Sequence, residues 1–282
     1  MASTVVTSGT PDQRYRMTPR NRYLGIIAAT LQQALAYRIM AISSIVANMF
    51  WIVILYHVWR AVFAEQDQLE GFTWNQMQTY ILLAYGINAM IGFASASRMI
   101  ATIRQGDVVI DMIRPINYLR SQLSYAVGLA ILEGAVSFTL TIGVGIVFLD
   151  MQPPASIGYG LLFLVSLPIG FLTKFLFVFS YTLLVFWVTN PTGINGTQIA
   201  IVNIFAGVLI PIQFLPGWLA TVADWSPLRG IVSTPATIYL GHLEGGRLAL
   251  VFGAQVAWLI LLWLFAEWAW PRAFRAVEIQ GG

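Results

Sequence analysis

The feature that most constrains this chain is a series of long, continuously apolar segments. Each is close to or above the roughly 20 residues that a helix needs to cross the hydrocarbon core of a bilayer. A transmembrane β-barrel would instead show alternating apolar and polar residues. The sequence therefore predicts an all-α integral membrane protein with about six transmembrane helices. The predicted spans cover residues 40–63, 78–97, 123–149, 157–189, 197–215 and 248–270.

The composition also indicates a membrane protein. Only 10% of the 282 residues are charged and 58% are hydrophobic, whereas a soluble domain carries about 25% charged residues. The ten tryptophans and eleven tyrosines fit the same interpretation, because both rings favour the boundary between membrane and water. Most of the exterior is therefore expected to face lipid.

The arginines set the expected orientation. They precede the first span, lie between the second and third spans, and follow the last one. With six spans these segments fall on one side, which the positive-inside rule assigns to the cytoplasm. Both termini are therefore expected to be cytoplasmic. The arginines concerned are Arg14, Arg16, Arg20, Arg22, Arg38, Arg98, Arg104, Arg114, Arg120, Arg272 and Arg275.

The segment 157–189 is too long for one upright span and too short for two. At 1.5 Å per residue it measures about 50 Å as a helix. Two spans would also place the last arginines outside the cell, against the charge rule. We expect one long, tilted helix, with Pro168 and Gly170 as the place for a kink.

The N-terminal segment has a different pattern. Residues 18–38 alternate apolar and polar side chains at near-helical period, which predicts an amphipathic helix on the cytoplasmic face. The alternative is a simple charged entry to the first span. Residues 1–17 are expected to form a disordered cytoplasmic tail, and residues 18–278 a single transmembrane domain.

Two further segments are too polar to span. Between the second and third spans, Val108 to Ile113 form a short amphipathic stretch, with Asp107 as a plausible N-cap and Pro115 as a stop. Residues 216–247 are rich in proline, tryptophan and glycine. We expect them to dip into the outer part of the membrane as short re-entrant helices, which is tolerated only where protein shields them.

The sequence lacks the residues that catalysis or cofactor binding would need. There is no cysteine, and His57 and His242 have no metal-ligand neighbour at helical spacing, so no metal site is expected. The only lysine, Lys174, lies within the fourth span, so a phosphate-binding loop is missing. We expect no catalytic residue and no bound cofactor in this chain, with any ATP hydrolysis on another chain.

Two charges lie inside predicted spans, where they are costly and normally face a partner or water. Glu133 and Lys174 stand about 20 residues before and after the same outer turn, so both have a similar depth. We expect them to form an ion pair. The alternatives are that either residue has a role in the substrate path, or that each side chain extends independently to the lipid headgroups. Three asparagines lie in three different spans: Asn48, Asn88 and Asn203. We expect them either to line a translocation path or to form interhelical hydrogen bonds.

The order of these parts resembles a known family. Two sequence motifs carry the resemblance, and together they are moderately specific. The first consists of Gly106, Asp107, Asp111, Arg114 and Pro115, and the second runs from Leu215-Pro216-x-Trp218-Leu219 to Ser226-Pro227-Leu228. Over residues 18–278 the chain is similar to the permease (transmembrane) subunit of an ABC-2 type ABC exporter.

The resemblance implies an assembly and roles for several segments. A dimer of cytoplasmic ATPase subunits, which bind ATP and magnesium, would pair with this chain and a second permease subunit, as a homodimer or with a paralogue. The element from Gly106 to Pro115 would be the coupling helix that docks on the ATPase, or else a plain connector. The 18–38 helix would be the connecting helix, and the segment with Pro216, Trp218, Trp225 and Pro227 the outer gate.

The resemblance further implies export by alternating access across a bacterial inner membrane, with membrane lipid but no nucleic acid as a partner. Aromatic, weakly polar spans favour amphiphilic or drug-like small molecules as substrates. Two alternatives stay open, a glycan or lipid-linked exporter of the same family, and an ion-coupled secondary transporter without an ATPase.

Overall fold

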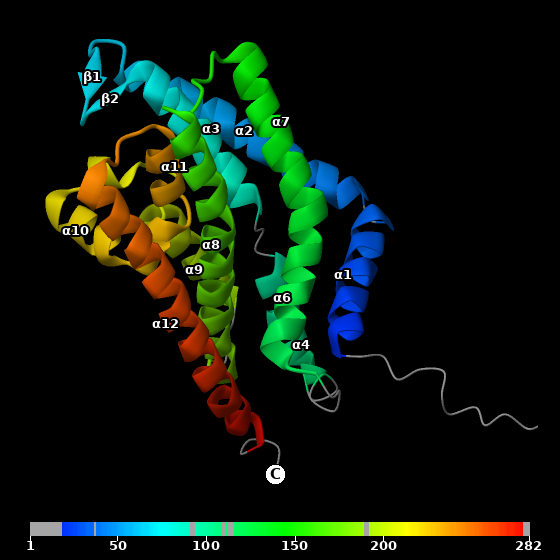
Figure 1. The fold of residues 1–282 in the computed structure, drawn as a ribbon. Helices are drawn as coiled ribbons and strands as arrows, with labels where there is room; N and C mark the ends of the chain where they lie inside the picture. The colour runs from blue at the N-terminus through cyan, green and yellow to red at the C-terminus, as the bar shows by residue number, and fades with distance from the viewer. Residues whose placement is uncertain are drawn as a thin grey trace, which may run out of the picture.

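The structure is a computed structural model that describes residues 19–36, 38–90, 94–108, 111, 116–188 and 192–278. Long helices run between two ends of the molecule, and short helices gather on one side (Figure 1). The elements are α1 (Pro19–Ala36), α2 (Arg38–Val62), β1 (Gln68–Leu69), β2 (Phe72–Thr73), α3 (Trp74–Met90), α4 (Ala94–Gln105), α6 (Tyr118–Leu129), the π-helix η2 (Ala130–Gly134), α7 (Ala135–Phe148), α8 (Ile157–Thr182), η3 (Leu183–Phe186), α9 (Thr192–Phe205), η4 (Ile212–Phe214), α10 (Gly217–Trp225), η5 (Pro227–Gly230), α11 (Ser233–Tyr239) and α12 (Gly245–Glu278).

Five helical segments in the described part of the chain are long and apolar enough to cross a membrane. The all-α membrane fold is therefore confirmed. Four of the segments are α2, α3 with α4, α6 to α7, and α12, and each agrees with a predicted span. The fifth, from Ile157 to Phe186, confirms that the long fourth segment is one helical span. Pro168 lies inside α8 without ending it.

The prediction of a continuous span at residues 197–215 is wrong. The helix in this region, α9, has 14 residues and ends at Phe205, so it is only about 21 Å long. The chain then turns at Gly207, whose φ of 80° favours glycine. Four short helices follow before α12 begins. Residues 216–247 thus form short helices as expected.

The arrangement of the ends agrees with an even number of crossings. The hairpin of β1 and β2 and the turn between α7 and α8 lie at one end of the molecule (Figure 1). The start of α1 and the end of α12 lie toward the other end. Helix α8 leads away from the hairpin end, and α12 begins again near that end. The chain between them returns to the hairpin end through α9 and the short helices.

Helix α1 forms where the sequence predicts it, but it stands along α6. The Asn117 amide donates to the Tyr23 hydroxyl at 3.2 Å. Further along both helices, a Cβ on Gly128 would lie 2.7 Å from the Cβ of Thr30. The two helices therefore run side by side in the same direction (Figure 1). The expected helix lying flat across the cytoplasmic face is not what this arrangement shows.

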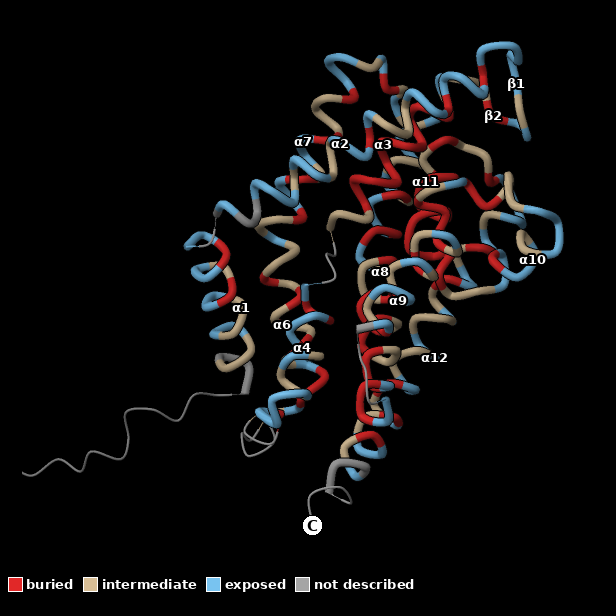
Figure 2. The backbone as a smooth tube through the Cα atoms, turned by 180° about the vertical axis from the view of Figure 1, so that it is seen from behind, coloured by how far each residue is buried: buried red, intermediate tan, exposed pale blue. Residues whose placement is uncertain are grey.

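Helix α3 is the centre of the bundle. Eleven consecutive residues, Met77 to Ile87, are buried, as expected for a helix with neighbours on every side. Buried residues concentrate in α3, α8 and α11, whereas α2 is largely exposed (Figure 2). One apolar cluster joins α3 to α8 and α11, and a second joins α4, α6 and the end of α8 to α12.

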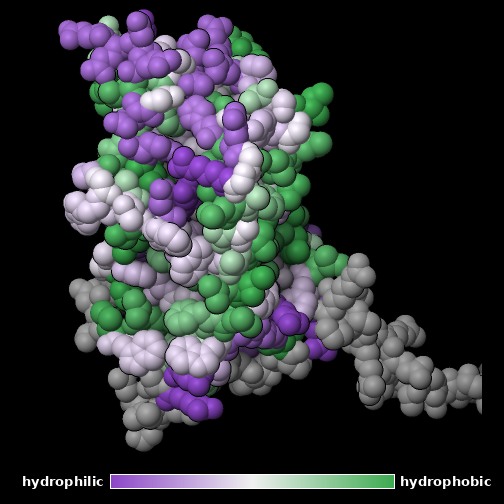
Figure 3. Space-filling model, turned by 60° about the vertical axis from the view of Figure 1, so that its left-hand side comes forward, coloured by the Kyte–Doolittle hydropathy of each residue, from purple (hydrophilic) through white to green (hydrophobic). Residues whose placement is uncertain are grey.

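The surface has the pattern of a protein in a bilayer. Hydrophilic residues gather at the hairpin end, and hydrophobic residues cover much of the middle of the same face (Figure 3). Large apolar side chains such as Val147 and Leu264 are 70% and 60% exposed. Exposed apolar residues on this scale indicate contact with lipid or another subunit.

The arrangement of the two ends predicts how single cysteines will react. The chain has no cysteine of its own, so introduced ones have no background. Glu65→Cys and Glu244→Cys should react with an impermeant maleimide added to intact cells. Gly106→Cys and Gly196→Cys should react only after permeabilisation. Labelling of Gly196→Cys from outside would contradict the six crossings.

Candidate functional site

A buried charge lies between α8 and α3. Lys174 on α8 has no exposed surface. Its ammonium group donates to the main-chain oxygen of Asn88 at 2.9 Å and to the side-chain oxygen of the same residue at 2.6 Å. Asn88 is on α3, two residues before Met90, the last residue described for this helix. Two oxygens of one residue on α3 therefore accept from this buried cation.

The second intramembrane charge stands on an irregular turn of the neighbouring crossing. Glu133 belongs to the π-helix η2, which joins α6 to α7. Single π turns inside α-helices are frequent at functional sites. The next residue is glycine for a steric reason: a Cβ on Gly134 would lie 2.7 Å from the main-chain oxygen of Met90. The Glu133 turn therefore packs directly on the end of α3.

A cavity of about 280 Å³ opens between these elements. Glu133 lines it from η2, Asn88 from α3, and Asn48 from α2. The Asn48 amide donates to the Ser137 hydroxyl at 3.4 Å, and Ser137 lines the cavity one turn beyond Glu133. The cavity thus has a carboxylate and several neutral hydrogen-bonding groups among apolar side chains.

The third asparagine of the predicted set joins the same cluster. The Asn88 amide donates to the side-chain oxygen of Asn203 on α9 at 3.5 Å. Asn88 therefore connects α3 to both α8 and α9. The structure thus gathers five polar residues from five different helical segments, which we call the polar cluster: Asn48, Asn88, Asn203, Glu133 and Lys174.

The predicted ion pair between Glu133 and Lys174 is not formed. In the described part of the chain no ion pair joins these two residues, and Lys174 turns to Asn88 instead. The two positions do have a similar depth, because both are next to the end of α3. Equal depth does not fix which way a side chain points around its helix, and the ammonium faces α3.

Sequence reasoning missed two parts of this site. The hydroxyl of Ser137 was not singled out, although it follows Glu133 by four residues and so faces the same side of a helix. The π turn itself was also missed. The residues of η2, Ala-Ile-Leu-Glu-Gly, carry no proline or other local signal that distinguishes such a turn from a regular α-helix.

The predicted coupling element lies at the opposite end from the β hairpin. Gly106 and Asp107 are exposed. The Asp111 amide donates to the Asp107 carbonyl at 3.4 Å, so a helical turn begins at Asp107. Between them Val108 is only 1% exposed and packs into the second apolar cluster. Arg114 and Pro115 lie outside the described residues.

The chain after this element is attached to the last crossing. Asn117 caps α6 by accepting from the Arg120 amide at 3.0 Å. The next residue, Tyr118, stacks on Trp270 of α12 with ring centroids 3.9 Å apart. The coupling element is therefore anchored at two places, by Val108 within it and by Tyr118 after it.

The predicted gate residues lie on the most exposed of the short helices. Pro216 precedes α10, and Pro227 begins η5. Trp218 and Trp225 on α10 are 72% and 77% exposed. The next short helix, α11, is buried from Ser233 to Ile238.

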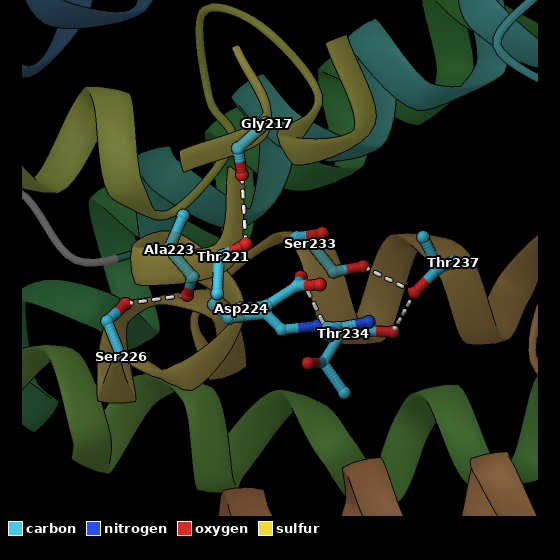
Figure 4. A network of polar contacts seen from close by, with 9 residues as sticks. Gly217, Thr221, Ala223, Asp224, Ser226, Ser233, Thr234 and Thr237 are labelled. Atoms are coloured by element: carbon cyan, nitrogen blue, oxygen red, sulfur yellow. Dashed lines mark hydrogen bonds and ion pairs between the residues drawn. The ribbon is translucent and has the colours of Figure 1, made fainter. Parts of the chain in front are cut away.

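Hydrogen bonds within the segment stabilise α10, η5 and α11. In Figure 4 the Thr237 hydroxyl donates to the carbonyls of Ser233 and Thr234, at 2.7 and 3.1 Å. Asp224 accepts from Arg229 at 2.8 Å. These bonds satisfy some of the polar groups of the segment within it, which lowers the cost of placing them in a low-dielectric setting.

Comparison with known proteins gives one family. The model of a family described as ABC-2 family transporter protein matches residues 49–281. No curated protein matches the sequence. The matched range contains the whole coupling element and the polar cluster except Asn48, and it leaves α1 outside.

The bond between Lys174 and Asn88 predicts an asymmetric pair of substitutions. Asn88→Ala removes the side-chain acceptor of a buried ammonium group and leaves the main-chain acceptor in place, and should lower the free energy of unfolding by about 2–3 kcal/mol. Adding Lys174→Met to Asn88→Ala should restore part of that loss, because the buried charge that lost this acceptor is then gone. Denaturation in detergent micelles would measure both variants.

Two comparisons make this prediction specific. Asn195→Ala is the matched control, because Asn195 bonds Ser97 at 3.5 Å and not the lysine; it should cost less than about 1 kcal/mol. Glu133→Gln should leave stability nearly unchanged. A double variant that loses the sum of the two single effects would contradict the role given to Lys174.

Proposed function

The chain belongs to the ABC-2 family of transporter proteins, and from that premise we propose that it is the permease of an ATP-driven exporter for amphiphilic or drug-like small molecules. Membership in the family makes it a membrane-spanning component of an ABC transporter. The observation that carries the finer proposal is the polar cluster. It places a carboxylate, a lysine and three asparagines among the crossings of the protein.

The cavity beside Glu133 suits a small amphiphile. Its volume of about 280 Å³ is near the lower limit for sites that hold drug-sized ligands. The wall combines Glu133, Asn48 and Asn88 with apolar residues such as Ile45 and Leu129. A carboxylate in apolar surroundings attracts a cationic or hydrogen-bond-donating head, and the apolar wall accepts the rest of the molecule.

The alternatives have less support. A glycan path would be favoured by tryptophan or tyrosine side chains at stacking positions, and none of the described residues that line this cavity is aromatic. An ion-coupled secondary transporter would not need the family's ATPase. The match to an ABC-2 family over residues 49–281 favours the ATP-driven class.

ATP hydrolysis is proposed to take place on a partner subunit. The only lysine of the chain lies buried in α8, which leaves no phosphate-binding loop of the usual type. Among the described residues of the coupling element, Asp107 is exposed and charged, and Val108 beside it packs into the second apolar cluster. An ATPase that docks there would act on α4 and α6, which flank the element. ATP and magnesium would bind to that partner.

The assembly is proposed to contain two permeases and two ATPases in the inner membrane, with both termini of this chain cytoplasmic. Closure of the ATPases would move the coupling elements and shift the permease pair from inward- to outward-facing. The exposed α10 with Trp218 and Trp225 would form part of the outer gate. Such a gate must be able to move, and α10 is the least buried of the short helices.

Substitutions in the coupling element should separate transport from folding. Asp111→Ala or Arg114→Ala should leave the permease inserted and as stable as the wild type. Each should reduce substrate-stimulated ATP hydrolysis by the assembled complex and its transport, because the contact with the ATPase loses a charged group. Reconstituted proteoliposomes would provide both measurements.

Glu65→Ala is the matched control for this experiment. It removes an exposed acidic residue at the hairpin end, far from the coupling element, and should change nothing. Unchanged transport in Asp111→Ala, Arg114→Ala and their combination would make the element a plain connector.

The role of Glu133 in the cavity predicts a loss of transport without a loss of stability. Glu133→Gln keeps the shape of the side chain and removes its charge. Transport of a cationic amphiphile should fall by about tenfold or more, the size expected from losing a charge-assisted hydrogen bond. An uncharged amphiphile should be affected less. Equal effects on both compounds would show that the carboxylate does not select substrates.

A further inference from the structure

We propose that a second cavity, on the outer half of the protein and separate from the polar cluster, binds the phosphate headgroup of an anionic phospholipid. The cavity measures about 220 Å³ and lies between α10, η5 and the first turns of α12. It shares no lining residue with the cavity beside Glu133. The ABC-2 family assignment plays no part in this inference.

The inner end of this cavity is built for an anion. Arg229 on η5 is 9% exposed and pairs with Asp224 through one terminal nitrogen, at 2.8 Å. Its Nε has no hydrogen-bond partner among the described residues. Arg247 on α12 lines the same cavity and is exposed. The residues that line the cavity include two arginines and one carboxylate, a formal net charge of +1, which a phosphodiester would neutralise.

A third polar group at this end is partly used. Gln255 on α12 is 3% exposed. Its amide nitrogen donates to the carbonyls of Gly230 and Ser166, at 2.8 and 3.2 Å. These bonds tie α12 to η5 and α8. The amide oxygen of Gln255 has no partner in the described part of the chain, and it can accept from a hydroxyl group of a headgroup.

The outer end of the cavity is apolar and reaches the surface of the bundle. Leu250 is 69% exposed and Trp225 is 77% exposed, and Trp258 lies two turns beyond Leu250 on α12. Tryptophan side chains favour the membrane boundary. A ligand that fits both ends therefore has an anionic head and an apolar tail, and enters from the side that faces lipid.

The chemistry favours an anionic lipid over a zwitterionic one. The arginine–carboxylate pair is already neutral in sum, and Arg247 supplies the unbalanced charge. A headgroup with its own cation would bring a positive charge close to that arginine. We therefore expect phosphatidylglycerol to bind more tightly than phosphatidylethanolamine or phosphatidylcholine of the same chain length.

The experiment uses the purified full-length chain in uncharged detergent and follows its thermal unfolding as lipid is added. A ligand that binds the folded state raises the midpoint temperature with concentration. Phosphatidylglycerol should raise it and the two zwitterionic lipids should do so much less. Arg247→Gln should increase the concentration needed for half of the effect by about fivefold, the value of one arginine near an anionic headgroup.

Three controls decide the outcome. Arg60→Gln removes an exposed arginine at the end of α2, outside this cavity, and should change nothing. Glycerol phosphate and inorganic phosphate should have no effect at the concentrations where the lipid acts. The proposal fails if zwitterionic lipids act equally, if Arg60→Gln has the same effect as Arg247→Gln, or if the free phosphates replace the lipid.

The double variant Asp224→Asn with Arg229→Gln tests the inner end. It removes both partners of the ion pair together, so no unpaired buried charge is left. Stabilisation by phosphatidylglycerol should be lost in this variant. Full retention of that stabilisation would overturn the placement of the phosphate at Arg229.

Discussion

The arrangement of the crossings depends on satisfying one ammonium group in an apolar interior. Lys174 has no exposed surface, and a buried charge is tolerated only with hydrogen-bonding partners. Asn88 supplies two of them, one from the main chain and one from the side chain. Two residues further along α3, Met90 gives η2 a place to pack, through Gly134. The buried charge, α3 and the π turn therefore form one connected arrangement.

The outer half of the protein follows a related constraint. Short helices expose the main-chain polar groups of their ends, and in a bilayer other protein groups must satisfy them. Side chains from the long helices do so here: the Tyr80 hydroxyl donates to the Gly207 carbonyl at 2.8 Å, and Gln255 donates to Gly230. Tyr239 returns a bond, from its hydroxyl to the carbonyl of Gln152.

The sequence predicts the long elements well because their signal is continuous apolarity, and the structure confirms five of the six spans by length and composition. It fails at residues 197–215, because Val208, Leu209 and Ile210 extend the apolar run past the end of α9. Composition cannot show that Gly207 has already turned the chain. Depth could be predicted for Glu133 and Lys174, whereas rotation about the helix axis could not. The polar groups were found, but their pairing depends on packing.

The polar cluster lies at a boundary between two kinds of crossing. The helices α8 and α12 run without interruption past its level. The crossing formed by α6 and α7, which lines the cavity, is interrupted there by the π-helix η2. Such an interruption is where the two parts of a helix can change angle. A ligand beside Glu133 would thus contact a crossing that can bend, and its first half, α6, follows the coupling element in the chain. Only Lys174 reaches the cluster from the unbroken pair, and it does so through Asn88.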